Sequence, residues 1–120
     1  MRNEVFVKTF TATTEIAPYR IVALGAADGA VIQSDGHAKA NIGTSNIIGA
    51  DTDAQRCDVV LTGIAEVEYG GEVTRGAWLT ADAAGKAIAT TTAGHNVIGR
   101  ALTSGVAGDI GSVFLTNGVA

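Results

Sequence analysis

The sequence predicts an all-β fold with little or no helix, in the form of a small compact β-barrel of the tulip or sandwich type. The first sign is the choice of apolar residues: Val and Ile number 22 together, against 6 for Leu and Met. Thr adds 14 more β-branched residues, and the stiffness of such side chains at χ1 favours the pleated sheet. The second sign is glycine, at 16 of 120 positions, between short apolar runs where turns need positive φ. The third is the spacing of those runs, which turn residues interrupt at intervals of roughly 8 to 12 residues.

The apolar runs mark the expected strands in chain order. They are VFVKTF (5–10), RIVAL (20–24), AVIQ (30–33), CDVVLTG (57–63), IAEVEY (64–69), AWLT (77–80), KAIAT (86–90), NVIGRAL (96–102) and SVFLT (112–116). In IAEVEY the period of two places Ala65, Val67 and Tyr69 on one face, so the opposite face is expected to be wet. The segment 35–45 is rich in small polar residues and is expected to be the longest loop.

Similar phrases recur in the same order along the chain. EIAPYRIVALGAADGAVIQ from Glu15 is answered by EVTRGAWLTADAAGKAIAT from Glu72, NIIG by NVIG, and DVVLTG by SVFLTNG. A half of about 50 residues cannot bury its own apolar face, whereas two halves packed together can. We therefore expect residues 1–14 to form an N-terminal arm and first strand, and residues 15–120 to form one domain with an internal duplication, 15–69 and 72–120.

Charge and composition exclude several classes of protein. The formal net charge is −4 and the basic residues are scattered, which argues against nucleic-acid binding. No run approaches the roughly 18 apolar residues of a membrane span, and MRNEVFVKTF has charges where a signal peptide needs its apolar centre. The sequence thus predicts a soluble protein that is not exported.

Candidate catalytic and metal-binding residues are few, and each has a simpler structural explanation. His37 and His95 have no further ligand at metal spacing, and the serines lack a nucleophile elbow. Cys57, the one cysteine, is expected to be a buried strand residue. Two acidic pairs occur, Glu66 with Glu68 and Asp51 with Asp53, and the first pair is expected to lie on a solvated strand face. We therefore predict no enzyme, no metal and no cofactor.

Two binding functions stay open as alternatives. Lys86 follows a hairpin tip in AAGKA, much as biotin and lipoyl carrier domains present their modified lysine, although Gly85 precedes it where such domains place Met or an acidic residue. A β-barrel module that binds a small ligand or carbohydrate is the other alternative.

Between Val7 and Leu115 the layout resembles the small capsid cement, or decoration, proteins of tailed bacteriophages. The stretch that carries the resemblance best is DVVLTGIAEVEYGGEVTRGAWLTADAAGKA, from Asp58. The resemblance implies a head-stabilising virion protein, made in the host bacterial cytoplasm, that docks on the outer surface of the mature shell. It also implies a β-barrel, usually a homotrimer, whose partner is the major capsid protein.

The residues that would make these contacts are expected in two places. The N-terminal arm precedes the first repeat, and an unpaired leading strand can add to a neighbour's sheet. The residues expected to contact the capsid are Arg2, Asn3, Val5, Phe6, Lys8 and Phe10. That the arm closes its own barrel is an equally open alternative. Trp78 is expected in the core or as an anchor of the oligomer interface, with Tyr19 and Tyr69 as further interface candidates.

Overall fold

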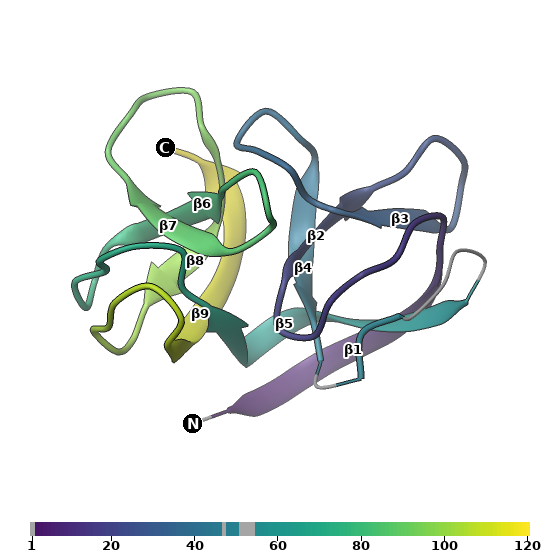
Figure 1. Cartoon of the computed structure of the whole chain (residues 1–120), viewed down its shortest axis with the longest axis horizontal. Helices are drawn as coiled ribbons and strands as arrows, with labels where there is room; N and C mark the ends of the chain where they lie inside the picture. Colours follow the sequence, from purple (N-terminus) through teal and green to yellow (C-terminus); the bar gives the residue numbers. More distant parts are fainter. Residues whose placement is uncertain (1, 47, 51–54) are drawn as a thin grey trace.

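The computed structural model describes residues 2–46, 48–50 and 55–120, which form nine strands and no helix (Figure 1). The strands are β1 (Asn3–Ala12), β2 (Ile21–Leu24), β3 (Ala30–Gln33), β4 (Asn41–Ser45), β5 (Arg56–Glu68), β6 (Trp78–Ala81), β7 (Ala87–Thr90), β8 (Asn96–Ala101) and β9 (Ile110–Val119). They belong to one sheet with the order β1-β3-β2-β4-β5-β9-β8-β6-β7, and β1 pairs additionally with β5. The all-β prediction is confirmed. No helix in the described residues is long and apolar enough to cross a membrane.

The two halves of the chain repeat one pattern of strand pairing. In the first half the order is β3-β2-β4-β5, and in the second it is β7-β6-β8-β9. Figure 1 shows the two groups side by side, with the β6–β7 hairpin on the left and the β2–β3 hairpin on the right. The isolated bridges repeat as well, because Ile16 pairs with Ala50 in the first half and Val73 with Gly105 in the second, both antiparallel.

β5 belongs to both halves. As the last strand of the first half it pairs antiparallel with β1 and β4, and its C-terminal part pairs antiparallel with β9. Gly63, near the junction, has a φ of 101°, and a Cβ there would lie 2.4 Å from the Asn3 carbonyl oxygen. Only glycine suits that position, since other side chains rarely adopt such a φ and the neighbouring backbone leaves no room.

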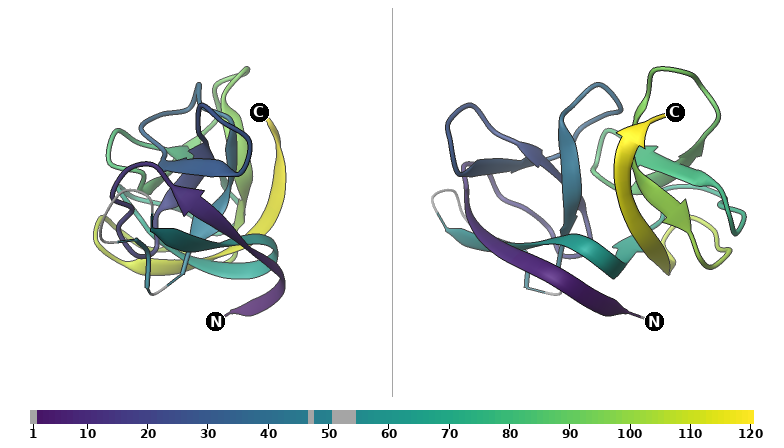
Figure 2. Two further views of the ribbon diagram at one scale, coloured as in Figure 1. Left: turned by 90° about the vertical axis from the view of Figure 1, so that its right-hand side faces the viewer. Right: turned by 180° about the vertical axis from the view of Figure 1, so that it is seen from behind.

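Each half has its own apolar core, and β5 supplies residues to both. Cys57 and Val59 pack with Val22 and Val31 in the first half, whereas Val67 packs with Leu79, Ile98 and Val113 in the second. Figure 2 shows that β5 and β9 both curve along their length. Ala65, Val67 and Tyr69 are buried while the alternate residues of the strand are half-exposed, so the predicted two-faced pattern is confirmed.

Two sequence predictions about the strands are wrong. The predicted loop 35–45 contains β4, whose Thr44 and Ser45 are buried and pair with Val60 and Val59. The small polar residues of this segment show no strand pattern in the sequence. β4 is held by its pairing with β2 on one edge and β5 on the other. The predicted break between residues 63 and 64 is absent, since Gly63 bends β5 without ending it.

Tyr69 packs directly against Gly111 in the second core. A Cβ at position 111 would lie 2.1 Å from Cζ of the fully buried Tyr69 ring. We expect Gly111→Ala to destabilise the protein by about 1–3 kcal/mol, because the ring must move within a packed core. Chemical denaturation would measure this. Gly36→Ala is the control, since a Cβ there meets nothing within 4 Å; equal losses in both variants would contradict the packing argument.

Candidate interaction surfaces

The N-terminal arm is a paired strand, and the expectation of an unpaired one is wrong. β1 pairs antiparallel with β5 from Asn3↔Ile64 to Thr11↔Arg56, and its end pairs parallel with β3. The alternative expectation, in which the arm closes its own barrel, agrees with this pairing. Pairing with β5 holds the arm, because β5 is long enough to lie beside almost the whole length of β1.

The side chains of the arm are nevertheless exposed. Val5 is 72% exposed, Phe6 53% and Val7 40%. Arg2, Asn3 and Lys8 are exposed as well, and Phe10 is half-buried against the first core, with the Lys8 ammonium 5.8 Å from the centroid of its ring. A strand with three consecutive exposed apolar residues gains little from its own core, and exposed apolar patches of this kind mark interaction sites.

The three predicted oligomer-interface residues lie in different surroundings. Tyr69 is fully buried, and its hydroxyl donates a hydrogen bond of 2.7 Å to the Thr103 carbonyl, so its assignment to an interface is wrong. The period-two pattern had already placed this ring on the core face. Tyr19 is half-buried in a turn at a φ of 58°, and its carbonyl accepts the Glu68 amide.

Trp78 is half-buried and belongs to a row of side chains that crosses the sheet. Strand register aligns Trp78 with Arg100, Arg100 with Phe114, and Phe114 with Ile64. The Arg100 guanidinium lies 4.1 Å from the centroid of the Trp78 ring, and Phe114 is 52% exposed. Single-sequence reasoning missed this row, because only the pairing of four strands brings its residues together.

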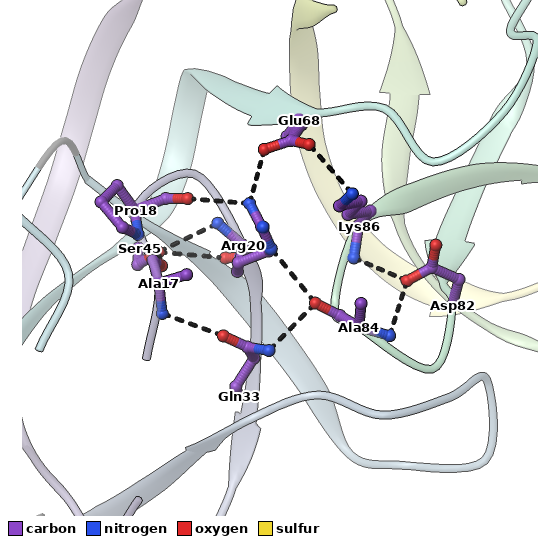
Figure 3. A network of polar contacts seen from close by, with 9 residues as sticks. All are labelled: Ala17, Pro18, Arg20, Gln33, Ser45, Glu68, Asp82, Ala84 and Lys86. Atoms are coloured by element: carbon purple, nitrogen blue, oxygen red, sulfur yellow. Dashed lines mark hydrogen bonds and ion pairs between the residues drawn. The ribbon is translucent and has the colours of Figure 1, made fainter. Parts of the chain in front are cut away.

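A charged cluster joins the two halves where they meet (Figure 3). Glu68 accepts a hydrogen bond of 2.7 Å from Arg20 Nη1 of the first half and lies 3.2 Å from Lys86 Nζ of the second. The Ala84 carbonyl accepts from Arg20 Nε and from Gln33 Nε2. Lys86 is therefore engaged in an ion pair, which differs from the exposed turn lysine of a carrier domain.

The charges around Glu68 determine how it titrates. Partial burial by itself would raise the pKa of this carboxyl, but the hydrogen bond from Lys86 and the charge and hydrogen bond of Arg20 outweigh it. The pKa of Glu68 is therefore lowered. A carboxylate with a lowered pKa in the folded state stabilises the fold above its ordinary pKa, and this stabilisation is lost as the pH falls through the lowered value.

The remaining reactive residues have simple environments. Cys57 is buried, as predicted, and burial together with the Asp58 charge raises the pKa of its thiol to about 11. The His37 and His95 rings, which come from the equivalent β3–β4 and β7–β8 loops of the two halves, are stacked 3.7 Å apart. Within the described ranges there is no pocket and no group of three metal-ligating side chains. The pair Asp51 and Asp53 lies outside the described residues.

Comparison with known proteins gives a match of fold. The N base of the head fiber protein gp8.5 of bacteriophage phi29, known from a crystal structure, superposes with a TM-score of 0.66. The match covers 92% of this chain and 93% of that chain, at 16% sequence identity. The two chains share a fold. No protein-family model and no curated protein matches the sequence.

The ion pairs of Glu68 lead to a prediction about acid. We expect Glu68→Gln to lower the free energy of unfolding at pH 7 by about 0.5–1 kcal/mol, because both ion pairs are partly open to water. The deficit should disappear as the pH falls through the lowered pKa of Glu68, since the wild-type carboxylate then becomes neutral too. Urea denaturation between pH 3 and 7 would measure it.

The exposed pair Lys39 and Asp35, 3.7 Å apart, supplies the control. Asp35→Asn should change stability little at any of these pH values. A deficit in Glu68→Gln that persists unchanged at the lowest pH would show that the loss does not come from charge.

Proposed function

We propose that this protein is a structural component of a phage head, which binds the outer surface of the mature capsid and stabilises it. The observation that carries the proposal is the fold shared with the phi29 head fiber base, which extends over nearly the whole of both chains. The cement-protein resemblance of the stretch from Asp58 to Ala87 supports the same conclusion from an independent direction.

The physical character of the molecule agrees with such a role. Cement requires a rigid body and surfaces for its neighbours, and no chemistry. The strands from β1 to β9 supply the rigid body, and the described part of the chain contains no pocket that would favour the small-ligand alternative. Many weak contacts on one particle add up to firm attachment, and a protein that binds only the mature lattice stabilises it by mass action.

The exposed side chains of β1 are the proposed capsid contact. Val5 and Phe6 supply apolar area, and Arg2, Asn3 and Lys8 surround it with polar and charged groups. Such a combination of an apolar centre and a polar rim is typical of protein–protein interfaces. The threefold oligomer that the resemblance implies stays a prediction.

Copy number on the particle tests the proposal. In gradient-purified, DNA-filled particles of the source phage, we expect quantitative mass spectrometry to find about one copy per major capsid protein. Mild denaturant that spares the shell should release the protein, because its attachment is noncovalent. Absence from the particles, or only a few copies, would contradict the proposal.

Add-back to stripped particles tests the contact surface. Deleting residues 2–8 should abolish binding, but it also uncovers the edge of β5. The substitutions Val5→Ser and Phe6→Ser together are therefore sharper, and should weaken binding at least tenfold while the protein stays folded. Leu24→Ser, at a residue 50% exposed on β2, is the matched control and should bind normally.

A further inference from the structure

The row of side chains from Trp78 to Ile64 forms an exposed band across four strands. Trp78 on β6 is in register with Arg100 on β8, which is in register with Phe114 on β9 and, through it, with Ile64 on β5. Cross-strand partners of this kind lie on the same face of a sheet, with their Cβ atoms about 5 Å apart. Phe114 is 52% exposed, Arg100 is exposed and the other two are half-buried. The row is therefore a continuous apolar surface that contains one cation.

Two contacts hold Arg100 in place. Its guanidinium lies 4.1 Å from the centroid of the Trp78 ring, and its Nη1 donates a hydrogen bond of 2.9 Å to the Gly76 carbonyl. A guanidinium has five N–H donors in a planar fork, so donors remain for another acceptor. Among the described residues no carboxylate lies within ion-pair distance of Arg100, whereas Arg20 is paired with Glu68. Arg100 is thus pre-organised for an acceptor outside the described residues.

A carboxylate is the acceptor that this setting fits. The planar fork of arginine matches the two oxygens of a carboxylate, and an apolar contact that excludes water strengthens such a pair. Arginine and tryptophan are also enriched among the residues that contribute most to protein–protein binding. The formal net charge of −4 repels an acidic surface from most of the molecule. A single held cation therefore determines where an acidic group can approach.

The row also adjoins the strand already proposed as the capsid contact. Ile64, at its end, pairs with Asn3 of β1, and the exposed Val5 and Phe6 follow in that strand. The apolar area of β1 and the apolar area of the row thus belong to neighbouring strands. A partner that covers one of them can extend over the other.

We propose that the row is part of the capsid contact, and that Arg100 binds the carboxylate of an Asp or Glu side chain of the major capsid protein. Phe114 and Ile64 pack against apolar surface around that carboxylate and keep water from the ion pair. The inference rests on the proposed function, to which it adds the chemistry of the partner group.

Binding to stripped particles tests the role of Arg100. Arg100→Gln should raise the dissociation constant about tenfold or more, because the partner carboxylate loses its charged hydrogen bonds inside an apolar contact. Lys39→Gln removes the same charge from an exposed loop residue and is the matched control, which should bind as the wild type does. Phe114→Ser should weaken binding as well, and it carries the test if Arg100→Gln proves to be unfolded. Circular dichroism melting checks the fold of each variant.

Photo-cross-linking identifies the partner group. With p-benzoylphenylalanine in place of Phe114, we expect a cross-link to the major capsid protein, at a segment that contains Asp or Glu. The same photo-reactive residue in place of Leu24, which is 50% exposed on β2, is the control and should give no such cross-link. Replacing the identified acidic residue of the capsid protein by Arg should restore binding of the Arg100→Glu variant.

The outcomes separate this inference from the proposed function. Wild-type binding by Arg100→Gln and Phe114→Ser, a cross-link to a capsid segment without Asp or Glu, or a cross-link to a second copy of this chain would each overturn the inference alone. Failure of the wild-type protein to bind stripped particles would instead overturn the proposed function, and the inference with it.

Discussion

The backbone pairing of β5 is the constraint on which the rest of the structure depends. This strand is hydrogen-bonded on both edges, to β1 on one side and to β4 and then β9 on the other. It is the last strand of one half and the first of the next, so neither half can be complete without it. Gly63 permits the bend between the two roles, because its positive φ and the close approach of Asn3 exclude a side chain.

Contacts between the halves reinforce this shared strand. Glu68 at the end of β5 binds one cation from each half, and the Ile21 amide donates to the Gly85 carbonyl across the same seam. The stacked His37 and His95 rings join equivalent loops further along. The two units therefore behave as one body, although their apolar cores are largely separate.

Sharing one strand also explains why β1 is the most exposed strand of the first half. In the second half the equivalent of β1, which is the C-terminal part of β5, is covered by β1, whereas among the described residues no strand covers β1 itself from Asn3 to Phe10. The exposed edge and the apolar side chains of β1 thus follow from the architecture itself.

The sequence by itself determined the all-β class, eight of the nine strand positions in outline, the burial of Cys57 and the two-faced pattern of the IAEVEY segment. These depend on side-chain period and turn residues, which are local. Only the tertiary structure decided that β4 is a strand, that β5 is continuous and that the N-terminal arm is paired, because hydrogen bonds to strands distant in sequence hold all three. The alternation of IAEVEY placed Tyr69 on the same face as Ala65 and Val67. The sequence pattern alone could not exclude the interface role that was also predicted for its ring. The row from Trp78 to Ile64 and the Glu68 cluster likewise exist only where separate strands meet, so no single stretch of sequence could reveal them.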